Sequence, residues 1–166
     1  MKMWIVLLCG LLLGGCGTGP QWETVSDTLD RPVVAAEPAS VTYTVPDGAV
    51  LAASTADALQ NYYVGPEDRY EVLQQCFTAE SLNEAVKAVT GFDADRIAVV
   101  ETRQGDCQRY DMSWTSAGET TQVCRGTILH DGSYYYCLTF ACAEDFSREY
   151  LSAGEEMLQS FALAED

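Results

Sequence analysis

From residue 41 onward, the first part of the chain has the alternating apolar and polar positions of short strands. Residues 41–45 alternate in this way and stop at a Pro-Asp-Gly turn, which predicts one strand. Residues 61–64 and 69–77 predict two more strands, joined by the Gly-Pro-Glu-Asp turn at 65–68. The chain therefore enters its folded part through strands.

A helix pattern follows these strands. Ser81 and Glu84 have the spacing of a capping box, in which the serine oxygen accepts an amide hydrogen and the glutamate reaches back. Gly91 suits the left-handed stop of such a helix. Between them one apolar face recurs at helical spacing, formed by Leu82, Ala85, Val86 and Val89.

Four consecutive antiparallel strands are predicted next, at 96–103, 107–116, 120–130 and 133–142. Tyr110, Met112 and Trp114 alternate onto one face of the second of these strands. Asp131-Gly132 is a strong signal for a two-residue hairpin turn, because both positions need a positive φ. The pairs predicted across this hairpin are Leu129 with Tyr134, Arg125 with Leu138, and Val123 with Phe140.

An amphipathic stripe at helical spacing closes the chain, formed by Phe146, Tyr150, Ala153, Met157, Leu158 and Phe161. Glu144 and Asp145 precede it, where a helix dipole favours negative charge. The order of these elements predicts one α+β domain over residues 41–166: strands, a helix, a four-stranded meander and a long helix. In that domain helices cover an antiparallel β-sheet.

The N-terminus has the features of an export signal, over residues 1–15. Lys2 gives a positive start, and the apolar run at 4–13 is shorter than the roughly 20 residues that span a bilayer. The run ends in Leu13-Gly14-Gly15-Cys16, which resembles the lipobox of bacterial lipoproteins. That resemblance implies acylation of the Cys16 sulfur and cleavage before it. Several acyl chains anchor a protein stably to membrane lipid. The alternative is an ordinary secretory signal in which Cys16 is incidental.

Charge and composition narrow the possible partners. Removing residues 1–15 removes Lys2, so the formal charge changes from −16 to about −17. Such a field repels phosphate backbones, which makes nucleic acid an unfavourable partner. Residues 16–40 combine the lipidated cysteine with a run rich in Gly, Thr, Pro and acidic residues, which predicts a flexible tether. We expect the domain to lie outside the cytoplasm, at the cell membrane or the outer envelope surface.

The C-terminal third resembles a known family. A hairpin with a Tyr-rich second strand at 125–140 is followed by a helix and by Met157-Leu158-Gln159-Ser160-Phe161. This order resembles the end of PsbP/Mog1-like domains, and Tyr43-Thr44-Val45-Pro46-Asp47-Gly48 resembles their opening strand and turn. The resemblance covers about half of the domain and implies an α-β-α sandwich. Members of this family mostly bind or assemble other proteins, so it also implies a binding role without catalytic residues.

Five cysteines remain in the domain, and in an exported chain the default expectation is disulfides. The predicted hairpin places Cys124 and Cys137 diagonally on one face, and a slip or bulge at Gly126 would close the gap between them. This pair is therefore the first candidate. The alternatives are Cys76 with Cys142, or Cys107 with Cys76.

The sequence contains no catalytic or metal-binding motif that we can identify. The one histidine, His130, stands beside the hairpin turn, and we interpret it as a turn residue and not a ligand. Asp93-Ala94-Asp95 lacks the remaining oxygens of a calcium loop. In the run 134–136, Tyr134 and Tyr136 share one face and Tyr135 points to the other. Core packing explains this run, and the functional alternative is that Tyr135 lines a groove for a peptide or a glycan.

These patterns predict a membrane-anchored, non-enzymatic binding or assembly module of the cell envelope, with no cofactor and no metal. Its partner would be an envelope protein, bound through the sheet edge or an exposed aromatic patch. The alternative is a lipoprotein that binds a small ligand or a metal and presents it to a transporter, which requires a deep pocket with polar groups. A thiol-dependent enzyme is the third hypothesis, and it requires an accessible cysteine with a basic neighbour.

Overall fold

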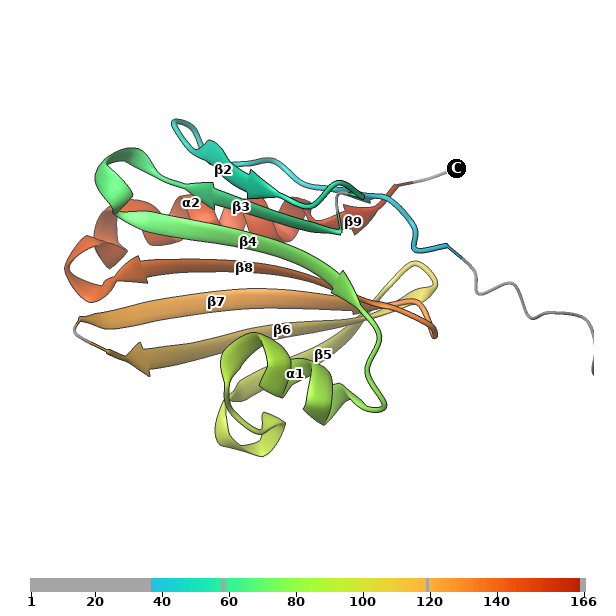
Figure 1. Cartoon of the computed structure of the whole chain (residues 1–166). Coiled ribbons are helices and arrows are strands. Elements are labelled where there is room, and N and C mark those ends of the chain that lie inside the picture. Colours follow the sequence, from blue (N-terminus) through green and yellow to red (C-terminus); the bar gives the residue numbers. More distant parts are fainter. Residues whose placement is uncertain (1–36, 58, 119, 165–166) are drawn as a thin grey trace, which may run out of the picture. The chain divides into compact units, whose positions relative to one another are not determined.

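The computed structural model describes residues 37–57, 59–118 and 120–164, which form an α+β domain (Figure 1). Its centre is a seven-stranded antiparallel sheet in the order β2-β3-β4-β8-β7-β6-β5. The strands are β2 (Val50–Ser54), β3 (Gln60–Val64), β4 (Tyr70–Phe77), β5 (Ala98–Gln104), β6 (Cys107–Ala117), β7 (Thr121–His130) and β8 (Tyr135–Ala143). Two short strands, β1 (Val41–Thr42) and β9 (Ala162–Leu163), pair with each other.

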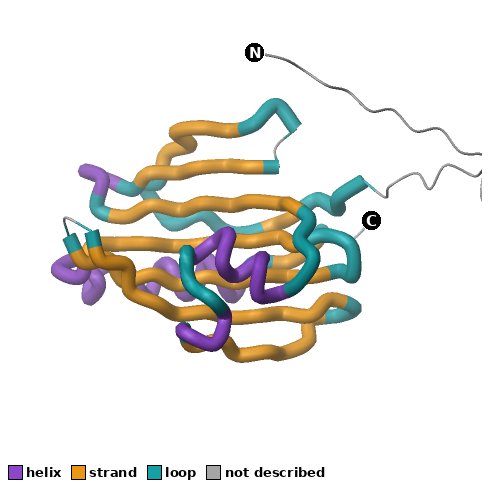
Figure 2. Tube along the Cα trace, turned by 60° about the horizontal axis from the view of Figure 1, so that its bottom comes forward, coloured by secondary structure: helices purple, strands orange, loops and turns teal. Residues whose placement is uncertain are grey.

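The two α-helices, α1 (Leu82–Thr90) and α2 (Ser147–Ser160), cover opposite faces of this sheet (Figure 2). The alternation of β8 shows why: Tyr136, Leu138 and Phe140 pack with α2, whereas Tyr135 and Cys137 pack with α1. Short 3₁₀ turns, η1 (Pro66–Asp68), η2 (Ala94–Arg96) and η3 (Glu144–Phe146), connect the elements. The predicted fold class, an antiparallel sheet between helices, is confirmed.

Helix α1 begins and ends as its sequence predicts. The Glu84 N–H donates to Ser81 Oγ at 3.3 Å, and Gly91 follows the last turn with φ of 79°. The glutamate side chain reaches back one residue further than expected, because Glu84 Oε2 accepts from the Glu80 N–H at 3.0 Å. Both signals are local, which is why they could be identified without the rest of the fold.

The β7–β8 hairpin corrects the predicted register. His130 faces Tyr135 and Leu129 faces Tyr136, so every predicted pair is shifted by two residues. The Asp131 side chain explains the shift, because its Oδ1 accepts the N–H groups of Ser133 and Tyr134, each at 2.8 Å. The connection is thus a four-residue loop at 131–134 and not a two-residue turn.

Two strands were not predicted, and one is shorter than predicted. β2 and β9 had no clear alternation, and the strand predicted at 41–45 ends at Thr42. After Thr42 the pairing with β9 stops, and the Thr44 N–H donates to Ser160 Oγ at 2.8 Å. The predicted signal at 1–15, Cys16 and most of the tether lie outside the described residues.

Candidate binding site

A groove of about 840 Å³ lies on the α2 side of the sheet, between the segment 37–45 and strands β3 and β4. Five side chains from the sheet line it: Asn61 and Tyr63 from β3, Gln74 and Cys76 from β4, and Tyr136 from β8. Its volume is in the range that small-ligand pockets occupy. We call this cavity the groove.

Strand alternation explains why these side chains share one face. Asn61 lies directly across from Gln74, and Cys76 lies across from Tyr136, so their side chains project from the same side of the sheet. On the opposite wall Tyr43 contributes its hydroxyl, which donates to Tyr63 Oη at 3.3 Å. Residues distant in sequence thereby form one concave surface.

The polar side chains of the groove have hydrogen-bond partners within the domain. The Asn61 amide donates to Gln74 Oε1 at 2.6 Å, and the Tyr136 hydroxyl donates to Asp131 Oδ2 at 2.7 Å. Burial, and then the contact with Tyr63, raises the pKa of Tyr43 above its usual range, so this phenol stays neutral. Among the described residues that line the groove, none is Lys, Arg or His. The groove thus suits a neutral or positively charged group better than an anion.

The cysteines of the domain are poor nucleophiles. Cys76 is half-buried in the groove, and burial, followed by the charge of Asp131, raises the pKa of its thiol to about 11. Burial also raises the pKa of Cys124 to about 11, and the pKa values of Cys107, Cys137 and Cys142 are raised for the same reason. No described cysteine therefore has the lowered pKa that thiol catalysis needs.

The expected disulfide between Cys124 and Cys137 is wrong. Cys124 faces Ala141 and Cys137 faces Ile128, so the two cysteines are four residues apart along neighbouring strands, roughly 13 Å. That exceeds the reach of a disulfide. The cause is the two-residue shift of the hairpin.

The alternative pairs fail for the same kind of reason. Cys76 and Cys142 lie at opposite ends of the β4–β8 pairing, and two strands separate Cys107 from Cys76. All five described cysteines are free thiols.

Tyr135 does not form a binding surface. Its side chain is only 5% exposed, and its ring stacks on His130 with centroids 4.2 Å apart and an interplanar angle of 11°. Helix α1 covers this face of β8, which the tyrosine pattern alone did not reveal. Tyr136 is fully buried on the opposite face, so the core-packing interpretation of this run is the correct one.

The acidic residues near α1 are engaged in surface contacts. The Asp93 carboxylate accepts from Lys87 Nζ at 3.1 Å and from Asn83 Nδ2 at 3.4 Å. Within the part of the chain that the structure describes, no three His, Cys, Asp or Glu side chains are grouped to hold a metal ion.

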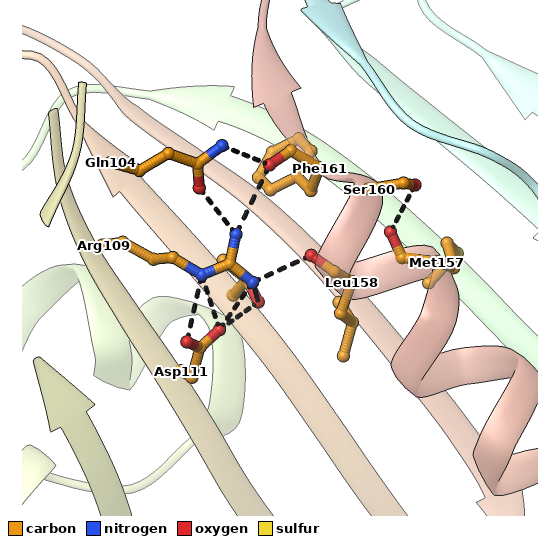
Figure 3. Close-up of polar contacts among 8 residues, drawn as sticks. Gln104, Arg109, Asp111, Met157, Leu158, Ser160 and Phe161 are labelled. Carbon is orange, nitrogen blue, oxygen red and sulfur yellow. Dashed lines mark hydrogen bonds and ion pairs between the residues drawn. The ribbon is translucent and has the colours of Figure 1, made fainter. Parts of the chain in front are cut away.

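Arg109 lies at the centre of a polar cluster that joins β6 to the end of α2 (Figure 3). From β6 its Nη2 donates to the Leu158 carbonyl at 2.9 Å and its Nη1 to the Phe161 carbonyl at 3.4 Å, at the C-terminal end of α2. Asp111 pairs with the same guanidinium at 2.9 Å, and Gln104 and Thr127 accept its remaining hydrogens. With its donors occupied, Arg109 secures the helix to the sheet and is not an anion site.

The exposed apolar side chains gather on the two edges of the sheet. Among the described residues the large hydrophobic side chains left exposed are Val50 (68%), Leu51 (50%) and Val100 (60%). The first two belong to β2 and the third to β5, the edge strands. All five residues of β2 are exposed and none is charged. We call this uncharged strand the β2 edge.

Comparisons with known proteins identify the fold. No family model matches the sequence, and no curated protein matches it. LpqN, a protein involved in cell envelope biogenesis of Mycobacterium tuberculosis, superposes with a TM-score of 0.54 and 11% identity, over 78% of this chain and 87% of its own. CyanoP, the cyanobacterial PsbP of Synechocystis sp. PCC 6803, gives a TM-score of 0.53 and 12% identity, over 92% and 99%.

The yeast Ran-binding protein Mog1p, from Saccharomyces cerevisiae, gives a TM-score of 0.49 and 13% identity, over 75% and 90% of the two chains. The superpositions with LpqN and CyanoP show that the domain has a PsbP/Mog1-like fold, as the sequence resemblance predicts. None of the helices within residues 37–164 has the length and apolar character to cross a bilayer.

Proposed function

We propose that this chain is a non-enzymatic binding module of the bacterial cell envelope, anchored to a membrane by lipid on Cys16. The N-terminal run ending in Leu13-Gly14-Gly15-Cys16 supports the anchor. The likeness in fold to LpqN, a protein of mycobacterial envelope biogenesis, is consistent with an envelope location. The raised pKa values of the thiols argue against thiol chemistry.

The β2 edge is the observation that carries the binding role. An edge strand leaves a row of backbone N–H and C=O groups unpaired, and natural edges are usually protected by charges, proline or a bulge. β2 has one irregularity, between Leu51 and Ala53, but no charge and no proline, and it exposes Val50 and Leu51 in a chain of net charge −16. An extended segment of an envelope protein can add to this strand, with backbone bonds giving affinity and the two apolar side chains giving specificity.

Photocrosslinking in intact cells tests this proposal. A benzophenone amino acid replaces Leu51 in the full lipidated chain, and the same probe at Ala88, an exposed position on α1, is the matched control. We expect one dominant envelope protein to be captured from position 51 and not from position 88. When the probe is placed at Val50 instead, capture should be lost if Leu51→Lys adds a charge to the contact. Equal capture at both positions, or none at 51, would refute binding at the β2 edge.

The groove favours a second candidate function, the binding of a small ligand for presentation to a transporter. Its volume of about 840 Å³ and its amide and phenol groups meet the requirement for a pocket with polar groups. Native mass spectrometry of the protein purified from its own cells tests this. Ser40→Trp, which places a ring in the groove, should abolish a co-purifying small molecule, whereas Leu51→Lys should retain it. Absence of any such molecule from the parent protein would favour the β2 edge alone.

A further inference from the structure

The edge opposite the β2 edge is β5, and its backbone geometry follows from the hairpin that ends it. Gly105 and Asp106 form a two-residue turn, and Gln104 and Cys107 pair on either side of it. In an antiparallel ladder, alternate residues direct both backbone groups to the same neighbour. The backbone N–H and C=O groups of Gln104 point to β6. Those of Val99, Glu101 and Arg103 therefore point outward from the sheet.

The charges along β5 differ from those of the whole chain. Five exposed charged residues lie on or beside this strand, Asp95, Arg96, Glu101, Arg103 and Asp106, and their formal charges sum to only −1. The whole chain carries −16. At this edge an approaching copy of the same acidic protein therefore meets little local repulsion.

We infer that β5 pairs antiparallel with β5 of a second copy of this chain, with Thr102 on the two-fold axis. In that register Glu101 of each copy faces Arg103 of the other, so two opposite-charge pairs form between directly facing residues. Both residues have outward backbone groups, so the same pairs also exchange hydrogen bonds. Val100, which is 60% exposed, then lies across from Gln104 of the second copy.

Neighbouring registers are less favourable. If the two-fold axis passes through Glu101 or Arg103 instead of Thr102, two like charges lie directly opposite each other, which is destabilising. An axis at Val100 places Glu101 across from Val99 and leaves the charge without a facing partner. The order Glu-Thr-Arg at 101–103 is thus self-complementary about its middle residue.

The inference does not depend on the partner proposed for the β2 edge, because the two strands lie at opposite ends of the sheet (Figure 2). Confinement of anchored copies to one membrane would raise their effective concentration and favour even a weak contact. At physiological ionic strength a Debye length of about 8 Å limits the repulsion between the remaining acidic surfaces.

Cysteine crosslinking of the full lipidated chain in its own membrane tests the register. Residues on the axis form a non-hydrogen-bonded pair with Cα atoms about 4.5 Å apart, which a disulfide can bridge. We therefore expect mild oxidation to convert Thr102→Cys to a dimer bonded through position 102. Val100→Cys is the matched control, since its two copies would be roughly 13 Å apart. Equal dimer yields from the two variants would overturn the proposed register.

Charge reversal tests the pairing itself. In the Thr102→Cys background, Glu101→Arg or Arg103→Glu alone places like charges opposite each other, and we expect the dimer yield to fall by about tenfold. The double reversal restores opposite pairs and should restore the yield. Both side chains are exposed, so the monomer fold should persist, which circular dichroism would verify. Single reversals with unchanged yield, or a double reversal without rescue, would refute pairing through β5.

Discussion

At the scale of single residues, Gly154 shows how closely helix α2 approaches the sheet. A β-carbon at this position would lie 2.6 Å from ring carbons of Phe140, which is fully buried and cannot move aside. We expect Gly154→Ala to lower the free energy of unfolding by about 1–3 kcal/mol, because overpacking outweighs the better helix propensity of alanine. Urea denaturation measures the change.

A matched control is Gly118→Ala, where the nearest atom to an added β-carbon is the Thr120 carbonyl oxygen at 3.8 Å. This variant should remain within about 0.5 kcal/mol of the parent. If the two alanine variants were equally stable, the tight contact between α2 and Phe140 would be wrong.

The thiols give a second prediction at this scale. The chain from Gly17 onward should show five free thiols when it is denatured without reductant, because all five described cysteines are unbridged. A count of three free thiols would instead demonstrate one disulfide. In the native protein Cys76, with a pKa of about 11, should be alkylated at pH 8 roughly a hundred times more slowly than an unperturbed thiol. Its rate should rise as the pH approaches 11, where the thiolate forms.

At the scale of elements, Arg109 holds the C-terminal end of α2 to β6. Arg109→Ala removes one donor from the Leu158 and Phe161 carbonyls and the cation beside Asp111, and the Arg109 side chain is only 12% exposed. Because Asp111 is 43% exposed and still accepts from the Thr127 hydroxyl, we expect a loss of about 1–3 kcal/mol in the free energy of unfolding and faster amide exchange in the last turn of α2. Arg148→Ala, at an exposed position of the same helix, should change neither quantity appreciably.

Local signals and tertiary contacts explain which elements could be predicted from sequence. Helix α1 was predictable because its cap and its stop are set by neighbours within one turn, Ser81 and Gly91. The hairpin register was not, because the Asp131 side chain binds two backbone amides and widens the loop. β2 escaped prediction because all its residues are exposed and the irregularity between Leu51 and Ala53 breaks the alternation.

The candidate site was less predictable than the fold. The possibility of binding through a sheet edge followed from the predicted antiparallel sheet, but the chain gave no sign of which strands form the edges. The groove depends on register, since Asn61, Gln74 and Tyr136 come from three strands whose pairing no local pattern fixes. The alternative in which Tyr135 lines a groove could not be decided from sequence for the same reason: the burial of Tyr135 is set by α1, nearly fifty residues earlier in the chain.

At the scale of the whole molecule, the two sheet edges differ in chemistry. The β2 edge is apolar and uncharged, which suits a segment of another protein, whereas β5 carries the self-complementary pair Glu101 and Arg103. A module anchored at its N-terminus could use both at once, because the strands lie at opposite ends of the sheet. Paired copies would then present two β2 edges to envelope partners.

The anchor itself is testable on the whole molecule. Cys16→Ser removes the sulfur that would carry the lipid and that cleavage requires, so mass spectrometry of the variant should show no acyl chains and should show residues 1–15 retained. Cys9→Ser is the matched control, because it removes a cysteine from the same apolar run without touching the expected cleavage position. If Cys16→Ser were cleaved at the same position and had the same modification mass as the parent, lipid on Cys16 would be refuted. The crosslinking experiments at β2 and β5 would then need to be interpreted without a lipid anchor.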